Sequence, residues 1–182
     1  MERSVLAGLM KTAPEISEGQ QFCGDIDMRI RRDGTWLYHG SPIGRKQMVK
    51  LFSSVLKRDS NGEYWLETPA EKCRIQVEDV PFIALSMDVS GKGREQILEF
   101  KTNIDEIVVA SVRSPIRVET DLITNEPSPY IMVRDGLEAL ISRAVFYDLV
   151  ELGITEVIEG QDLFGVWSSG VFFELGNLDG YD

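Results

Sequence analysis

Histidine and cysteine are scarce in this sequence of 182 residues, which contains one His and two Cys. The single histidine, His39, excludes metal sites built from several histidines and mechanisms that need two of them. Cys23 and Cys73 are far apart and lack a CxxC motif. They match neither a zinc pattern nor a disulfide framework, so we expect reduced, partly buried thiols. We predict no metal site and no cofactor.

Long apolar runs and known catalytic motifs are also missing. No segment approaches the roughly 20 apolar residues of a membrane span, and the N-terminus lacks the apolar core and cleavage site of a signal peptide. These absences predict a cytoplasmic protein. No nucleophile elbow, P-loop or dinucleotide motif is present, so we assign no catalytic residue; enzymatic activity stays uncertain and a binding role is favoured.

Charge is strongly acidic overall but unevenly spread. The net charge of −11 argues against partners such as nucleic-acid polymers and membrane surfaces. Residues 29–58 nevertheless hold eight Lys or Arg and a single acid, whereas residues 81–182 hold 7 basic and 18 acidic side chains. Two explanations stay open: the basic segment docks on the acidic second half, or it forms an anion-binding site.

The order of expected elements repeats along the chain. We predict an N-terminal domain over residues 1–80, with a loosely ordered lead-in over 1–20, and a C-terminal domain over 81–182. Each unit combines antiparallel strands with one main helix, at 43–57 and at 137–152, and Arg134 occupies the equivalent strand-to-helix turn of the second unit. Strand runs interrupted by single helices are typical of an α+β fold, and the repeat indicates duplication.

The segment "GDIDMRIRRDGTWLYHG" reads as a hairpin turning at Asp33 and Gly34. A two-residue turn there pairs Ile30 with Leu37 and leaves His39 at the rim of the apolar face. The opposite, polar face then carries Asp25, Asp27, Arg29, Arg31, Trp36 and Tyr38. Asp25 and Asp27 could hold a hard cation, but a salt-bridged face with the arginines is favoured.

A helix start follows directly, with Ser41 as the expected N-cap and Pro42 at the first helical position. Free N–H groups there suit phosphate or carboxylate, and Arg45 lies nearby. A solvated sheet face, a ligand-free helix start and a structural histidine remain the simpler alternatives. The candidate ligand-binding residues are Arg29, Arg31, Trp36, Tyr38, His39, Ser41, Arg45 and Arg134.

Five strings together resemble the bacterial domain-of-unknown-function family 1285: "GDIDMRI", "DGTW", "GSPI", "YWLETPAEK" and "VRDGLEALI". The resemblance covers nearly the whole chain after about residue 20. It implies an α+β protein built by duplication, with a second domain superficially like a pleckstrin-homology fold. It also implies a binding site for a nucleotide-like ligand at the domain interface and a role in signal transduction.

The leading hypothesis is therefore a regulatory module that binds a small anionic, nucleotide-like molecule between its halves. The alternative is a protein-interaction adaptor in which the same face docks a partner or a second copy as a homodimer. A metal-dependent hydrolase using Asp25, Asp27 and His39 is a third possibility.

Overall fold

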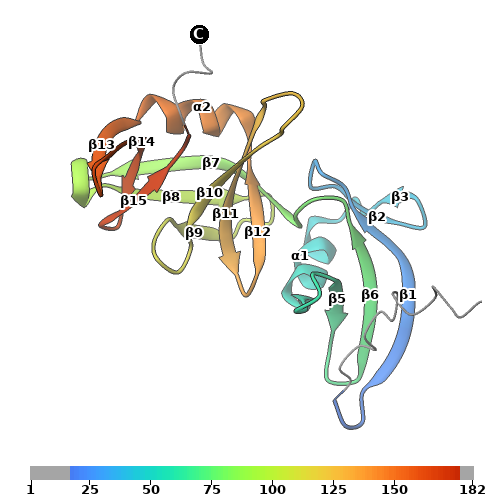
Figure 1. The fold of residues 1–182 in the computed structure, drawn as a ribbon. Coiled ribbons are helices and arrows are strands. Elements are labelled where there is room, and N and C mark those ends of the chain that lie inside the picture. Colours follow the sequence, from blue (N-terminus) through green and yellow to red (C-terminus); the bar gives the residue numbers. More distant parts are fainter. Residues whose placement is uncertain (1–16, 177–182) are drawn as a thin grey trace, which may run out of the picture.

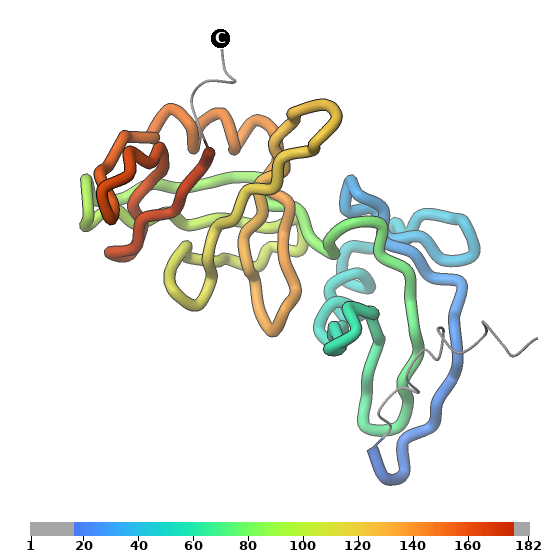
Figure 2. The backbone as a smooth tube through the Cα atoms, in the orientation of Figure 1, coloured from blue at the N-terminus to red at the C-terminus, as the bar shows by residue number. Residues whose placement is uncertain are grey.

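The computed structural model describes residues 17–176, so the lead-in expected over 1–20 lies largely outside the described residues. The described chain forms two six-stranded sheets, one three-stranded sheet and two α-helices (Figure 1). Both large sheets are curved, as the backbone trace shows (Figure 2). This mostly β architecture with two helices agrees with the predicted α+β class. No helix in the described range is long and apolar enough to cross a membrane.

The N-terminal sheet has the strand order β3-β2-β1-β6-β5-β4. β1 and β6 run parallel at its centre, and all other neighbours are antiparallel. Helix α1 connects β3 to β4 and lies on the side of the sheet that faces the second domain (Figure 1). The bounds are β1 Gln21–Ile30, β2 Trp36–Tyr38, β3 Ser41–Pro42, α1 Lys46–Ser54, β4 Leu56–Arg58, β5 Tyr64–Glu67 and β6 Glu71–Val77.

The C-terminal sheet has the order β10-β11-β12-β7-β8-β9, with β12 and β7 parallel at its centre. Helix α2 and the small sheet β13-β14-β15 follow it. The bounds are β7 Phe82–Ser90, the 3-10 turn η1 Gly93–Glu95, β8 Ile97–Thr102, β9 Ile107–Val109, β10 Ile116–Thr120, β11 Pro127–Arg134, β12 Leu137–Ile141, α2 Arg143–Glu151, β13 Ile154–Ile158, β14 Gln161–Ser168 and β15 Val171–Glu174.

Each large sheet consists of two three-stranded meanders whose first and last strands meet in parallel at the centre. The helices, however, occupy different positions: α1 joins the two meanders of the first sheet, whereas α2 follows the second sheet. The predicted equivalence of helices 43–57 and 137–152 is therefore wrong. Residues 137–141 form the buried central strand β12, and a short apolar run cannot be assigned to helix or strand by periodicity alone.

The β1–β2 turn contains three residues rather than the predicted two. The N–H of Arg31 donates to the carbonyl of Thr35, and Gly34 adopts a positive φ of 81°. Three-residue hairpin loops typically end on such a left-handed residue. The strand register shifts by one as a result: Ile30 pairs with Trp36, not with Leu37. A one-residue shift moves each side chain of β2 to the opposite face of the sheet.

Helix α1 begins later than the sequence indicated. Ser41 and Pro42 form the edge strand β3, which pairs with Tyr38 and Leu37 through a two-residue turn. Proline is tolerated at a sheet edge because its missing N–H is not needed there. The helix starts at Lys46, so the predicted cap at Ser41 is wrong.

Cys23 and Cys73 form a disulfide, contrary to the expected free thiols. The sequence separation of 50 gives no hint of this pairing, but β1 and β6 are neighbouring parallel strands. Their register brings the two Cα atoms to 5.0 Å, within the range that a disulfide requires. The bond therefore links β1 and β6, which are the first and last strands of the N-terminal sheet in chain order and neighbours at its centre.

Gly34 also lies at the contact between the domains. A Cβ there would lie 2.8 Å from both Asn103 Nδ2 and Ile83 Cγ1. We expect Gly34→Ala to lower the free energy of unfolding by about 3 kcal/mol, since left-handed backbone and overpacking add. Gly40→Ala is the matched control: its φ is +75°, but no atom lies within 4 Å of the added Cβ, so about 1 kcal/mol is expected. Equal losses in urea denaturation would contradict a packed domain contact at Gly34.

Candidate functional site

A cavity of about 720 Å³ lies between the two domains and is hereafter called the interface cleft. The first domain contributes the end of α1 and the strand β4, and the second contributes the turns that follow β8 and β11. Its lining residues are Lys50, Ser53, Ser54, Leu56, Lys57, Arg58, Ile104, Asp105, Glu106, Arg134 and Asp135.

Lysines of α1 hold one wall of the cleft in place through Asp105. Lys46 Nζ lies 2.8 Å from Asp105 Oδ1 and Lys50 Nζ lies 2.6 Å from Oδ2. Hydrogen bonds from these two lysines hold the pKa of Asp105 well below its usual value. The carboxylate stays ionised, and its contribution to stability is lost only as the pH falls through that lowered pKa. At least part of the basic segment therefore docks on the acidic second half.

Arg134 makes a second contact between the domains at the cleft. Its Nη2 donates to the carbonyl of Ser53 at 2.8 Å, and its Nε donates to Glu106 Oε1 at 3.3 Å. The guanidinium also lies 5.4 Å from the ring centroid of Phe82. Ser53 is in the last turn of α1, and its carbonyl, which carries partial negative charge, also accepts a backbone N–H at the C-cap. Arg134 thus adds a second, charged donor to a carbonyl at a helix end of the other domain.

Arg58 is the cation of the cleft that is best placed to pair with a ligand. Lys57 pairs with Glu67 at 3.3 Å, whereas Arg58 makes no ion pair among residues 17–176. The Arg58 guanidinium lies 5.6 Å from the centroid of the Tyr64 ring. Its donors can therefore meet an anionic group or a planar ring without displacing an existing acid.

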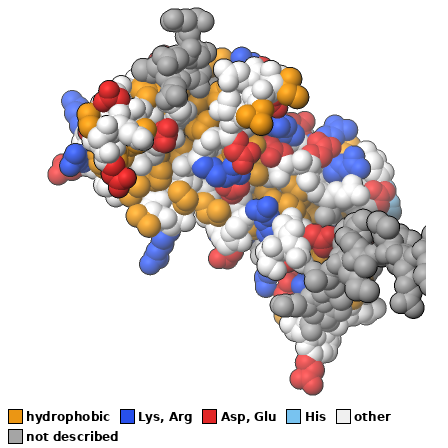
Figure 3. Space-filling model, in the orientation of Figure 1, with side chains coloured by type: hydrophobic (Ala, Val, Ile, Leu, Met, Phe, Trp, Pro, Cys, Tyr) orange, Lys and Arg blue, Asp and Glu red, His pale blue; other side chains and the backbone are white. Residues whose placement is uncertain are grey.

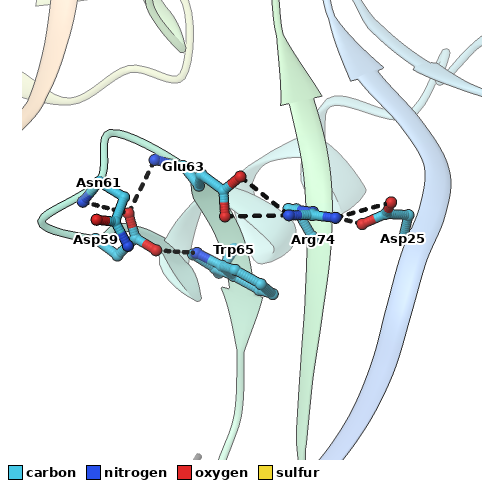
Figure 4. Close-up of polar contacts among 6 residues, drawn as sticks. All are labelled: Asp25, Asp59, Asn61, Glu63, Trp65 and Arg74. Carbon is cyan, nitrogen blue, oxygen red and sulfur yellow. Dashed lines mark hydrogen bonds and ion pairs between the residues drawn. The ribbon is translucent and has the colours of Figure 1, made fainter. Parts of the chain in front are cut away.

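A polar network fixes the turn that follows Arg58 (Figure 4). Asp59 accepts hydrogen bonds from the N–H groups of Asn61 and Glu63, each at 2.9 Å, and from the Trp65 indole at 2.9 Å. Burial alone would raise the pKa of Asp59, but these hydrogen bonds lower it overall. Since Asp59 directly follows β4, the network positions Arg58 at the edge of the cleft.

The same network contains Arg74 of β6, which pairs with Asp25 of β1. Arg74 Nη2 donates to Asp25 at 2.9 Å and Arg74 Nη1 donates to Glu63 at 3.0 and 3.1 Å (Figure 4). Hydrogen bonding to Asp25 raises the pKa of Arg74. A salt-bridged face is present, as expected, but the partner comes from β6 rather than from Arg29 or Arg31.

Trp36 lies in the core and not on the polar face assigned to it. Its exposed fraction is 2%, and it stacks on Phe52 of α1 with ring centroids 6.3 Å apart. Its Nε1 is buried without a hydrogen-bond partner in the described part of the chain. The one-residue shift of the β1–β2 register explains this burial, because it moves Trp36 to the side that packs against the helix.

Tyr38, His39 and Ser41 lie at the exposed end of β2 and β3. His39 is in the turn, with a positive φ of 47°, and its Nδ1 lies 3.2 Å from Asp27 Oδ2. The Tyr38 and His39 rings are 4.2 Å apart between centroids. The expected place of His39 on the apolar side is therefore wrong, since it belongs to an exposed turn.

The remaining predicted arginines are exposed and lie outside the cleft lining. Arg29 donates to Gln76 Oε1 from Nε at 3.1 Å and from Nη2 at 2.8 Å. Arg31 and Arg45 take part in none of the ion pairs among the described residues, whereas Arg29 Nη1 lies 3.9 Å from Glu78. Of the eight predicted site residues only Arg134 lines the cleft. Its predicted equivalence to a strand-to-helix turn is wrong, because β12 follows it.

The three residues considered as metal ligands do not come together. Asp25 is paired with Arg74, while Asp27 is beside His39. Among residues 17–176, the group of potential ligand atoms that does cluster comprises Cys23, Glu71 and Cys73, and its two sulfurs form the disulfide.

Comparison with known families matches both halves of the chain. The N-terminal domain of DUF1285, a domain of unknown function, matches residues 19–80, and its C-terminal domain, described as a protein of unknown function, matches residues 81–175. The chain belongs to the DUF1285 family. A search of curated proteins found no match.

Two solved DUF1285 structures share this fold. The family protein from Silicibacter pomeroyi DSS-3 is 51% identical, with a TM-score of 0.81, over 88% of this chain and 85% of that chain. The family protein from Shewanella baltica OS155 is 26% identical, with a TM-score of 0.54, over 69% of this chain and 91% of that chain. The family resemblance inferred from the sequence is thus confirmed.

Sequence reasoning missed most of the DUF1285 cleft. Lys50, Lys57 and Arg58 were counted in the basic segment, but nothing in their spacing singles them out. The sequence signal nearest to the cleft is the pair Asp135–Gly136, which is typical of a tight turn. In the structure both Asp105 and Asp135 lie in turns at positive φ.

Proposed function

We propose that the interface cleft binds a small anionic, nucleotide-like ligand. Binding would regulate the protein by strengthening the contact between its two domains. The observation that carries the proposal is a 720 Å³ cavity at the domain junction bordered by four cations, of which Arg58 is unpaired within the described residues. Such a volume is typical of small-molecule sites.

The chemistry of the lining favours a ligand with both charge and a planar group. Ser53 and Ser54 supply polar groups, Leu56 and Ile104 supply apolar surface, and the Arg58 guanidinium offers a stacking plane. Arginine planes hold bases by stacking as aromatic rings do. Asp105, Glu106 and Asp135 on the same lining disfavour a highly charged ligand, so a singly or doubly charged anion fits better than a triphosphate.

The role in signal transduction that the family resemblance implied is also part of this proposal. A role in signal transduction fits a ligand that contacts both domains, because binding would change how firmly they are held together. The pleckstrin-homology likeness of the second domain and its origin by duplication stay predictions. The adaptor alternative relied on an apolar surface at Trp36, and the burial of Trp36 removes that reason for it.

A nucleotide screen by thermal shift tests the proposal. At 100-fold excess over the dissociation constant, a ligand stabilises the folded state by about 2.7 kcal/mol, which for this chain length raises Tm by about 5–10 °C. We expect Arg58→Ala to weaken binding of the best nucleotide by about tenfold or more while Tm without ligand changes little, since Arg58 makes no ion pair among the described residues.

Arg45→Ala is the matched control, because Arg45 is an exposed arginine directly before α1 and outside the cleft. It should leave the shift in Tm unchanged. Two outcomes would contradict the proposal: no nucleotide stabilises the protein, or Arg45→Ala loses as much affinity as Arg58→Ala.

A further inference from the structure

The β10–β11 hairpin ends in two apolar side chains that are almost entirely exposed among the described residues. Leu122 is 100% exposed and Ile123 is 94% exposed. The hairpin projects past the start of α2 (Figure 1), and the space-filling view shows hydrophobic side chains at its end (Figure 3). Two adjacent aliphatic residues at full exposure are unfavourable in water, which marks this tip as a contact surface.

The tip is held in a defined conformation. Asp121 Oδ1 accepts the N–H groups of Ile123 and Thr124, each at 2.8 Å. The N–H of Asp121 donates to the Glu126 carbonyl at 3.0 Å, and that of Asn125 donates to the Asp121 carbonyl at 2.8 Å. These bonds prevent the tip from folding back on its own domain, and they reduce the entropy lost when a partner binds it.

A hollow of about 470 Å³ lies beside the tip and shares its wall. Buried Pro129, Ile141 and Phe146 form its apolar part. Its charged residues are Arg32, which lies 3.5 Å from Asp79, together with Arg143 and Glu126. The Nε of Arg143 donates to the Tyr147 hydroxyl at 2.9 Å. The hollow therefore combines apolar surface with positive charge.

We propose that this face binds a second copy of the chain, with the tip of each copy inserted into the hollow of the other. A two-fold contact needs one patch that carries both halves of a complementary pair. Here the protruding Leu122 and Ile123 complement the apolar part of the hollow, and Asp121 of the tip complements Arg143, which makes no ion pair among the described residues. This charge pattern selects a second copy over an anionic membrane, which the acids would repel.

The contact is small, so the dimer is expected to dissociate on dilution. Stable interfaces bury on the order of 1,200–2,000 Å², more than two loop tips alone provide. The inference is independent of the interface cleft, because neither the tip nor the hollow contributes a residue to its lining.

Sedimentation velocity of the full chain from about 1 μM to about 500 μM tests the proposal. We expect the wild type to shift from monomer to dimer within this range. Replacing Leu122→Ser together with Ile123→Ser should raise the dimer dissociation constant by about tenfold or more without lowering Tm, because both side chains are exposed in the monomer. Arg143→Glu should weaken the dimer as well, through repulsion of the tip acids.

Val112→Ser is the matched control, since Val112 is 79% exposed and lies outside the tip and the hollow. It should leave the dimer unchanged. A wild type that stays monomeric at every concentration, or a dimer that resists the tip substitutions, would overturn the proposal. Binding of a monomeric wild type to lipid vesicles, lost on the same substitutions, would overturn it too and assign the tip to membranes.

Discussion

Reduction of the Cys23–Cys73 disulfide is expected to lower the free energy of unfolding by about 4 kcal/mol, the loop-entropy estimate for a closed loop of 50 residues. For a chain of this length the same loss corresponds to a fall in Tm of about 8–16 °C. The bond ties the two central parallel strands of the N-terminal sheet, whose pairing closes the longest loop of that sheet. Thermal unfolding with and without dithiothreitol measures the effect.

The double variant Cys23→Ser with Cys73→Ser separates the bond from other effects of the reductant. Its Tm should equal that of the reduced wild type, and dithiothreitol should not change it further. If dithiothreitol left the wild-type Tm unchanged, the thiols would be free, as the sequence alone suggested. The result also bears on localisation, because stable disulfides are uncommon in a reducing cytoplasm.

Trp36→Ala is expected to lower the free energy of unfolding by about 3–5 kcal/mol, which is typical of removing a buried aromatic side chain. Trp36 is 2% exposed and its ring stacks on Phe52, so its loss leaves a cavity between α1 and the sheet. Trp36→Phe should cost much less, because it keeps an aromatic contact and removes the unpaired Nε1 donor. Urea denaturation measures both variants.

Tyr38→Ala is the control for Trp36, since Tyr38 is an aromatic residue of the same strand and 49% exposed. Its free energy of unfolding should stay within about 0.5 kcal/mol of wild type. The opposite pattern, in which Trp36→Ala keeps its stability but loses ligand affinity, would restore the stacking role that the sequence suggested for Trp36.

In the hairpin at residues 24–38, an error of one residue in the predicted turn length changes the predicted face of every side chain in β2. Asp33 and Gly34 correctly indicate a turn, but sequence does not reveal whether two or three residues form it. Because side chains alternate along a strand, one additional loop residue exchanges the two faces of β2. Trp36 thereby leaves the candidate site and joins the core. Gly34 instead contacts the second domain, a role with no local sequence signal.

The sequence by itself determined the family, the alternation that makes most segments strands, and the presence of a basic segment in an acidic chain. Each of these depends on local pattern or on composition. Only the tertiary structure decided that residues 137–141 form a strand, that Cys23 meets Cys73, and that Arg58 and Arg134 border one cleft. The pairing of β12 with β7, the disulfide and the cleft join residues about 50 or more positions apart, and such contacts leave no periodicity in a single sequence.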